Sequence, residues 1–310
     1  MGFFSKSRIA MNVSVVIPCY NVAAYVEECM ASIRSESADI PVLLVDNNST
    51  DNTLQVLQAL AEHDSNAHVL SEVSPGACSA RNTGLAEVQT QWVQFLDADD
   101  LLLPGAFAAR LRDEADIVVG SFRRRQVHGE ETTVHPNSDI WRGLFNTDLG
   151  ITSSVLFRTA TVRSADGWDP QLKSSQEYDL MFRCLQSGAR LQTVQAVTAV
   201  VRERESGQIS QTDPSARWHR YLDLRERILR HIKTADTGYF AEHSGAFYQQ
   251  LFDQIRILSN TDIQGATERY KRLIPADFSP QPSAATGALF LLLMKLFGFA
   301  NASRIRKLMP

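Results

Sequence analysis

The chain has 310 residues, of which 44% are hydrophobic and 21% are charged, so it can bury the core of one large α/β domain or of two smaller ones. The formal net charge of −4 gives no support to nucleic-acid binding, which usually needs a basic surface. The four cysteines form no Cys-x-x-Cys pair, so neither a zinc site nor a disulfide framework is indicated, and a reducing, cytoplasmic setting is the simpler interpretation.

The first hundred residues alternate short apolar runs with helical patterns. They follow a leader over residues 1–11, whose apolar run is too short for a secretory signal. Buried strands are expected at Val13–Ile17, Val42–Val45, Ala67–Ser71 and Trp92–Leu96. The intervening stretches have the spacing of helices, and strands that alternate with such helices indicate βαβ units in a parallel sheet. Ligands bind such sheets at the carboxyl ends of the strands.

The pattern changes after Pro104. Further strands are expected at Ile117–Phe122, Ser153–Phe157 and Leu191–Val201, with a hairpin or loop over Arg123–Asp139 and a short helix over Gln176–Gln186. Residues 214–274 are helical and charged. We therefore expect an α/β nucleotide-binding domain over residues 12–212, a helical extension over 213–282 and a separate C-terminal segment over 283–310.

This C-terminal segment is apolar and then basic. Gly287–Ala300 is apolar except for Lys295, and as a helix it would reach about 21 Å at ~1.5 Å per residue, short of a ~30 Å bilayer core. Arg304, Arg306 and Lys307 follow it. This composition is typical of a helix that lies in an anionic membrane interface. The alternative is a helix docked on the protein's own core or on a second subunit.

Three aspartates follow the fourth expected strand. Asp97 and Asp99 can turn toward one point if the backbone is irregular, and Mg²⁺ and Mn²⁺ are often held by one or two carboxylates together with substrate phosphates. Such a cation would relieve the repulsion within the cluster. The alternative is that Asp99 or Asp100 caps a helix entered through Leu101–Pro104.

Polar residues also follow the second and third expected strands. Asp46, at the end of a parallel strand, is suited to bind the base or ribose of a nucleotide, whereas Ser49 and Asp51 are suited to cap the next helix. Arg81 begins a helix after Pro75-Gly76, where it is either a phosphate contact or a solvated helix residue.

The helix over Gln176–Gln186 carries two acidic residues of interest. Its buried stripe is expected to contain Leu180, Met181, Cys184 and Leu185. Asp179 is placed to pair with Arg183 on the surface, a contact worth only ~0.3–0.5 kcal/mol. Glu177 lies on the inward side and is the better general base, although the helix dipole alone would also favour a glutamate there.

Taken together, these stretches resemble the family 2 inverting glycosyltransferases with a GT-A fold. The resemblance runs over roughly Val13–Ser210, through VSVVIPCYNVAAYVEECMASI, VLLVDNNSTDNT, SARNTGL, FLDADD and QEYDLMFR, in the family's order and approximate spacing. It implies a nucleotide-binding α/β sandwich, a nucleotide-diphosphate sugar as donor and, usually, Mn²⁺ or Mg²⁺ as cofactor. A lipid-linked or other carbohydrate acceptor in cell-surface polysaccharide or glycolipid synthesis would suit a cytoplasmic enzyme on the inner face of the membrane.

The resemblance also implies roles for individual residues. Three would border the nucleotide base: Pro18, Tyr20 and Asn21. Asp46 would hold the uracil or ribose end, and Arg81 would lie near the nucleotide. Asp97 and Asp99 would form the D-x-D pair, with Asp99 as the more direct metal ligand.

The sequence departs from the family pattern at three places. Asn47 replaces the second aspartate after the second strand. The catalytic Glu-Asp pair appears as Gln176-Glu177, so the base would be Glu177, with Asp179 as the weaker alternative. The Arg-x-His near the last strand appears as Arg202-Glu203-Arg204, and Arg204 cannot bind a cation but could stabilise the leaving diphosphate.

Two other classes of protein fit the sequence less well. A sugar nucleotidylyltransferase would show a glycine-rich phosphate loop with a basic residue after the first strand, where this chain has Pro-Cys-Tyr-Asn. A non-catalytic, membrane-associated scaffold on a degenerate transferase fold would explain the altered Gln176-Glu177, but it would have no use for a cluster of repelling carboxylates. The sugar and the acceptor are not specified by the sequence.

Overall fold

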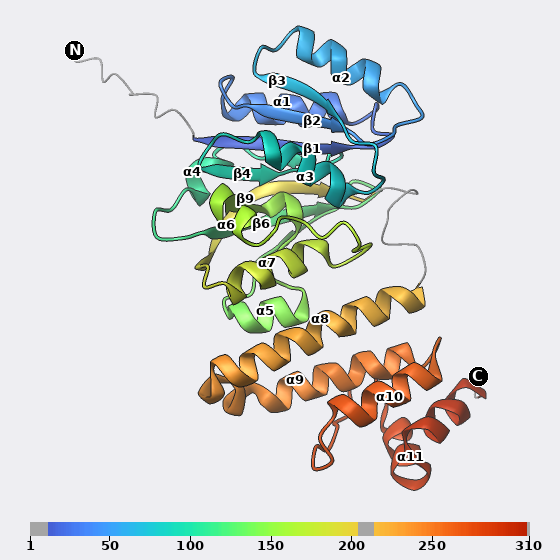
Figure 1. Ribbon diagram of the computed structural model, residues 1–310. Coiled ribbons are helices and arrows are strands. Elements are labelled where there is room, and N and C mark those ends of the chain that lie inside the picture. Colours follow the sequence, from blue (N-terminus) through green and yellow to red (C-terminus); the bar gives the residue numbers. More distant parts are fainter. Residues whose placement is uncertain (1–11, 204–213, 309–310) are drawn as a thin grey trace. The chain divides into compact units, whose positions relative to one another are not determined.

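The computed structural model describes residues 12–203 and 214–308 (Figure 1). The expected leader over residues 1–11 and Arg204 lie outside these residues. The described chain forms two compact units. The sheet unit contains residues 12–203 apart from two short segments, Trp141–Asn146 and Lys173–Ser175, and the helical unit contains those segments together with residues 214–308.

The sheet unit is built around one sheet of nine strands. The strands are β1 (Val13–Cys19), β2 (Val42–Asp46), β3 (Ala67–Ser71), β4 (Trp92–Phe95), β5 (Leu101–Leu102), β6 (Ile117–Arg125), β7 (Glu131–Val134), β8 (Val155–Arg158) and β9 (Leu191–Arg202). They lie in the order β3-β2-β1-β4-β8-β6-β9-β5, with β7 paired to β6. The first four strands are mutually parallel, as their βαβ pattern predicted. The second half is mixed, because β8 runs antiparallel to both β4 and β6.

Helices connect the parallel strands and cover the sheet. They are α1 (Val26–Glu36), α2 (Thr53–Glu62), α3 (Ala77–Glu87), α4 (Ala106–Arg110), α6 (Thr159–Ser164) and α7 (Gln176–Gln186), with a 3-10 helix, η1 (Thr152–Ser154). Alternate residues of β1, among them Val15 and Ile17, share a buried cluster with Cys29 and Ile33 of α1. Since each such aliphatic side chain gains about 1.5–3 kcal/mol on full burial, this cluster fixes the register of the strands.

Pro18 is the one residue of β1 that could interrupt the sheet. The pairing of β1 with β4 ends at Val16 and Phe95, whereas the pairing with β2 continues to Cys19 and Asp46. Pro18 therefore falls beyond the last β4 partner, where its missing N–H costs no ladder hydrogen bond. This explains why β1 runs two residues further than the sequence pattern indicated.

Helix α3 packs closely against the other face of the sheet through Gly84. A Cβ atom on Gly84 would lie 2.4 Å from Cγ1 of Val16, which is fully buried in β1. Arg81 lies one turn earlier on α3, so the close approach of Gly84 also brings Arg81 toward the sheet.

We expect Gly84→Ala to lower the free energy of unfolding by about 1–3 kcal/mol, because the stiff Val16 side chain leaves no room for a methyl group. Urea unfolding followed by circular dichroism measures this change. Gly245→Ala is the matched control, since a Cβ there meets nothing within 4 Å and the helix interior gains about 0.5–1 kcal/mol from the replacement. Equal effects of the two variants would contradict the packing argument.

The helical unit contains α5 (Ile140–Asn146) apart from its first residue, together with α8 (Pro214–Ala235), α9 (Thr237–Leu258), α10 (Ile263–Leu273) and α11 (Ala288–Leu308). Aspartates begin two of these helices, because the side chain of Asp236 accepts a hydrogen bond from the Tyr239 amide and that of Asp262 accepts one from the Gly265 amide. Aromatic rings fill the core around Phe252, and the rings of Tyr270 and Phe299 stack with their centroids 4.7 Å apart.

Helix α11 is divided in two by Gly298, whose φ of 77° and ψ of 165° are not helical. By length and composition the whole helix could cross a membrane, but the break leaves a first piece of only about 15 Å. One face of α11 is docked on the chain's own core, where Phe290, Phe299 and Ala302 are buried. The other face exposes Leu289, Leu292, Leu296 and Phe297, each by about half or more.

Candidate functional site

The loops after β1 and β2 are hydrogen-bonded to each other at the carboxyl edge of the sheet. Asn21 adopts a left-handed φ of 51°, its Oδ1 accepts a hydrogen bond from the Thr50 amide at 2.8 Å and its Nδ2 donates to Thr50 Oγ1 at 3.2 Å. The Ser49 hydroxyl accepts from the Asn21 amide rather than capping α2, so that expectation for Ser49 was wrong. Asp51 does accept from the Thr53 amide at the start of α2, as expected.

Three residues with expected nucleotide contacts thus lie at the end of β1. Pro18 is half-buried in the strand, Tyr20 is exposed at 57%, and Asn21 is engaged in the loop contact just described. Of these side chains, Tyr20 is the one that the fold leaves open to a ligand.

Asp46 is a buried carboxylate with an unsatisfied oxygen. It ends β2, in register with Cys19 of β1 and Ser71 of β3, and its Oδ1 has no hydrogen-bond partner among the described residues. Because buried polar atoms are nearly always paired, this oxygen is suited to accept a hydrogen bond from a ligand at the sheet edge.

The side chain of Asn47 forms hydrogen bonds with the backbone of the loop that leads into α3. Its Nδ2 donates to the carbonyls of Glu72 and Ser74, both at 2.8 Å, and its Oδ1 accepts from the Gly76 amide at 2.7 Å. An ionised aspartate could not donate the first two bonds. The replacement noted in the sequence is therefore accounted for by the geometry of this loop, which the sequence pattern did not reveal.

Arg81 is buried and joins three elements. Its Nη2 lies 2.7 Å from Oδ1 of Asp97, just after β4, and its Nη1 donates to Oε1 of Gln176, at the start of α7, at 2.9 Å. The guanidinium also lies over the Trp168 ring, 4.5 Å from its centroid. Arg81 is thus not a solvated helix residue, and its contact with Asp97 makes it part of the same cluster as the aspartates.

Asp100 does not cap a helix, contrary to the alternative drawn from the sequence. It is buried, its Oδ2 accepts from the Ser153 hydroxyl at 2.5 Å and its Oδ1 accepts from the Arg202 amide at 3.1 Å. Burial, together with the charges of Asp97 and Asp99, raises the pKa of Asp100 well above its usual range. The stability linked to this group is therefore present at low pH and is lost as pH rises through the raised pKa.

The segment after the aspartates is a strand because it completes the far edge of the sheet. Leu101 and Leu102 pair antiparallel with β9, and α4 begins only at Ala106. The carboxylate of Glu36 accepts hydrogen bonds from the amides of Gly105 and Phe107 at the start of α4. Neither Asp99 nor Asp100 is needed as a cap there.

Arg202, at the end of β9, holds the backbone of the aspartate loop. Its guanidinium donates to the Asp99 carbonyl and to the Glu28 carboxylate, and it lies 5.5 Å from the centroid of the Tyr25 ring. The sequence pattern pointed to Arg204, which lies outside the described residues, and not to this role of Arg202. Its place as the first arginine of the Arg-x-His-like stretch was the available signal.

Glu177 lies in the first turn of α7 and is half-buried. Burial raises the pKa of Glu177 above its usual value, Arg81 acts in the opposite direction, and the charge of Asp97 adds to the increase. The hydroxyl of Tyr178 fixes the start of this helix, since it donates to the Gly150 carbonyl at 2.7 Å and accepts from the Gly150 amide. Nothing in the local sequence pattern indicated this contact of Tyr178 with a residue 28 positions away.

Asp179 and Arg183 form the expected pair, but the pair is not on the surface. The two side chains are 4% and 21% exposed and 2.7 Å apart, and Arg183 also donates to the Ala165 carbonyl. Asp179 is therefore engaged in packing α7 against its surroundings, whereas Glu177 shares the electrostatic environment of Arg81 and Asp97.

The part of the chain that the structure describes contains no group of three or more histidine, cysteine, aspartate or glutamate side chains able to hold a metal. Two carboxylates could contribute to a metal site, those of Asp97 and the half-buried Asp99. One oxygen of Asp97 is bonded to Arg81. This donor set fits a hard divalent ion that takes one or two carboxylates and obtains its other ligands from water and substrate phosphates.

Comparison with known proteins bears on this arrangement. Residues 14–166 match the model of the glycosyl transferase family 2. The chain is 30% identical over 142 residues to the uncharacterized glycosyltransferase EpsJ of Bacillus subtilis, covering 44% of this chain and 41% of that protein. It is 25% identical over 191 residues to a chondroitin synthase of Pasteurella multocida, covering 57% of this chain and 19% of that protein. The chain thus spans about two fifths or less of the length of these curated relatives.

Two solved structures have a similar fold. Residues 1–349 of TarS from S. aureus, in complex with UDP-GlcNAc, superpose with a TM-score of 0.61 at 18% identity, over 95% of this chain and 90% of that one. The mannosyltransferase PcManGT from Pyrobaculum calidifontis, in complex with GDP-Man and Mn²⁺, gives a TM-score of 0.56 at 17% identity, over 96% of this chain and 87% of that one. These likenesses support the GT-A architecture expected from the sequence.

Proposed function

Because this chain belongs to glycosyltransferase family 2 through residues 14–166, we propose that it transfers a sugar from a UDP-sugar to an acceptor hydroxyl with inversion of configuration. The observation that carries the proposal is the convergence of Arg81, Asp97 and Glu177 beside the carboxyl end of β4. A buried cation, a carboxylate and a desolvated glutamate together provide the charges that a diphosphate donor and an attacking hydroxyl require.

Asp46 is the proposed contact of the uracil or ribose end of the donor. Its buried Oδ1 needs a hydrogen-bond donor, which an imide N–H or a ribose hydroxyl supplies. Pro18, Tyr20 and Asn21 would border the base, and the exposed ring of Tyr20 is suited to stack on it. A solved structure of similar fold that holds UDP-GlcNAc supports a uridine nucleotide.

Asp99 is the proposed direct ligand of Mn²⁺ or Mg²⁺, with Asp97 beside it and the diphosphate of the donor completing the site. Such a cation would neutralise charge on the departing diphosphate. Arg81 holds Asp97 in place, Arg202 holds the backbone at Asp99, and Arg204 remains a proposed contact of the diphosphate. The Mn²⁺ complex of the mannosyltransferase supports a divalent ion at this class of site.

Glu177 is the proposed general base. Its raised pKa makes the carboxylate a stronger base than an exposed glutamate, while the neighbouring Arg81 favours the ionised form. The carboxylate would accept the proton of the acceptor hydroxyl as the hydroxyl oxygen attacks the anomeric carbon from the face opposite the diphosphate. The bond to the diphosphate breaks as the new glycosidic bond forms, and a single displacement inverts the configuration.

The acceptor is proposed to be a carbohydrate or a lipid-linked sugar in surface polysaccharide or glycolipid synthesis, because several relatives are polysaccharide synthases. All four cysteines are buried and unpaired, which supports a reducing, cytoplasmic compartment. The exposed apolar face of α11 supports attachment to the inner face of a membrane.

Thermal melting with a panel of nucleotide sugars, with and without Mn²⁺, tests this function. A donor at 100 times its dissociation constant stabilises the folded protein by about 2.7 kcal/mol, so we expect a metal-dependent increase in Tm with a UDP-sugar. Asp99→Ala should abolish the metal-dependent part of the shift, whereas Asp100→Asn should retain it, because Asp100 is buried against Ser153 and Arg202. If no nucleotide sugar raises Tm, the transferase assignment fails and a degenerate scaffold is favoured.

A further inference from the structure

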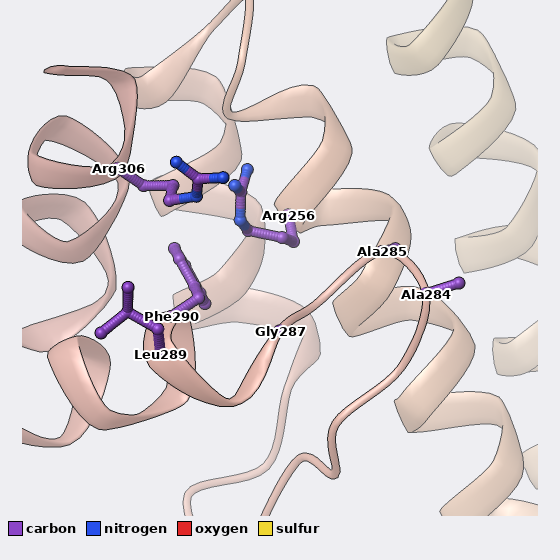
Figure 2. A pocket seen from close by; sticks show the side chains of 7 residues that line it. All are labelled: Arg256, Ala284, Ala285, Gly287, Leu289, Phe290 and Arg306. Carbon is purple, nitrogen blue, oxygen red and sulfur yellow. The ribbon is translucent and has the colours of Figure 1, made fainter. Parts of the chain in front are cut away.

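A second candidate site lies in the helical unit, at the start of α11. It is a pocket of about 560 Å³, within the size range of small-molecule sites, and Figure 2 shows the residues that line it. These residues are Arg256, Ala284, Ala285, Gly287, Leu289, Phe290 and Arg306. The proposed transfer chemistry uses none of them.

Two arginines in the lining of this pocket have no acidic partner among the described residues. In Figure 2 the guanidinium groups of Arg256 and Arg306 point toward one another. Neither forms an ion pair with a carboxylate in residues 12–203 or 214–308. The side chain of Asp253, one turn before Arg256 on α9, is instead bonded to the hydroxyls of Ser283 and Thr286, both at 2.7 Å. Two cations placed together in this way favour an anionic ligand.

The lining of the pocket contains a buried arginine, Arg256, whose side chain is held in place by hydrogen bonds. Its residue is 8% exposed, its Nη1 donates to Ser259 and Asn260, and its Nε is buried with no hydrogen-bond partner among the described residues. The guanidinium also packs over the ring of Phe290, 4.5 Å from its centroid. Burial and the charge of Arg306 lower the pKa of Arg256. A buried donor without a partner is costly, and an anion in the pocket would satisfy it.

The wall of the pocket formed by the first turn of α11 is apolar. Leu289 and Phe290 line it, and the apolar surface continues from Leu289 to Leu292 and Leu296, at helical spacings of three and four residues, and to the neighbouring Phe297. The amide groups of the first turn of α11 add the positive end of its dipole to the same region. An anion site that opens beside an apolar helix face fits an amphiphile with a charged head.

We propose that this pocket binds the phosphate group of a lipid, with Arg256 and Arg306 as its ligands and the exposed leucines of α11 in contact with the acyl region. The lipid is identified by its chemistry, as a phosphate or diphosphate monoester on an apolar chain. Phosphate oxygens accept hydrogen bonds from several guanidinium donors at once, which matches two arginines in one pocket whose guanidinium groups point toward one another. This binding is independent of the proposed sugar transfer.

Co-sedimentation of the full chain with vesicles tests the proposal. Phosphatidylcholine vesicles that contain about one third phosphatidic acid should bind the protein much more tightly than phosphatidylcholine alone. Arg306→Gln should weaken this binding about tenfold or more, because it removes a charge-assisted contact, and Arg306→Lys should restore part of it. Arg304→Gln is the matched control, since Arg304 lies on the same helix but does not line the pocket, and its general electrostatic effect is about fivefold or less.

Melting experiments separate a lipid from a soluble phosphate. Dihexanoyl phosphatidic acid, used below its micellar concentration, should raise Tm in the unaltered protein and not in Arg306→Gln, while inorganic pyrophosphate should have little effect. Arg256→Met, which keeps the packing on Phe290, should behave like Arg306→Gln if circular dichroism shows that it folds. Equal losses in Arg304→Gln and Arg306→Gln would overturn the site. An Arg306-dependent shift with pyrophosphate, without vesicle binding, would overturn its assignment to a lipid.

Discussion

Glu177→Gln is expected to lower the kcat of sugar transfer by about 10²–10⁴-fold, the usual contribution of a positioned general base. The amide keeps the size of the side chain but cannot accept the proton of the acceptor hydroxyl. Donor binding should change little, because the proposed donor contacts are Asp46, Asp97 and Asp99. Initial rates with a UDP-sugar, compared with the donor-induced change in Tm of the same variant, separate the two effects.

The pH dependence of sugar transfer should reflect the ionisation of Glu177. The base is active when ionised, and the pKa of Glu177 is raised by its burial, so kcat should fall with decreasing pH at a value above that of an exposed glutamate. The effect on stability has the opposite sign. A folded-state pKa above the unfolded value means that stability decreases as pH rises through it, so Glu177→Gln should be at least as stable as the parent at neutral pH.

Asp179→Asn is the control for this assignment. Asp179 is the alternative base, but its carboxylate is 2.7 Å from the Arg183 guanidinium and almost fully buried. We expect Asp179→Asn to lower the free energy of unfolding, because it weakens a buried ion pair, while kcat per folded molecule is largely retained. A loss of turnover in Asp179→Asn with normal turnover in Glu177→Gln would transfer the role to Asp179.

The sheet was largely predictable from the sequence because its strands are buried apolar runs separated by polar turns. Seven of the strands overlap predicted segments, although β8 begins at Val155 rather than Ser153 because Thr152–Ser154 forms a 3-10 helix. The stretch Arg123–Asp139 contains the second strand of the β6–β7 hairpin. The strand Leu101–Leu102 was missed, since two residues carry no periodicity and their pairing with β9 is about one hundred residues away in sequence. The break of α11 at Gly298 was also missed, because one glycine in an apolar helix pattern does not reveal its dihedral angles.

The candidate site was predictable in its residue types but not in its partners. Asp46, Arg81, Asp97 and Glu177 were singled out as candidates because they follow strands or lie in the first two turns of helices. The different roles of the three aspartates could not be predicted, because only the three-dimensional contacts show that Asp100 accepts hydrogen bonds from the Ser153 hydroxyl and the Arg202 amide. The same is true of Asn47, whose three loop contacts lie 25–29 residues away in sequence. The local sequence pattern gives no information about hydrogen bonds between residues so far apart in the chain.

Arg81→Met is expected to have the second large effect, lowering both stability and donor-dependent activity. The change keeps much of the packing against Trp168 but removes the bonds to Asp97 and Gln176. Because the Asp97 side chain is 33% exposed and can regain water, the loss in the free energy of unfolding should be about 1–3 kcal/mol, below that of a fully buried pair. Arg81→Lys should not restore activity, since an ammonium cannot bond both partners in the geometry of the guanidinium fork.

A double-mutant cycle and a remote ion pair distinguish a specific role of Arg81 from general destabilisation. Arg81→Met and Asp97→Asn should be non-additive by about 0.5–3 kcal/mol in the free energy of unfolding, as expected for residues in direct contact. Arg34 forms a similarly shielded pair with Asp64, away from the aspartate loop, so Arg34→Met should lower stability but leave the metal-dependent shift of Tm with a UDP-sugar intact. In Arg81→Met that shift should be lost, because Asp97 no longer has the cation that holds it beside Asp99. An intact shift in Arg81→Met, or an equal loss in Arg34→Met, would show that the ion pair does not organise the donor site.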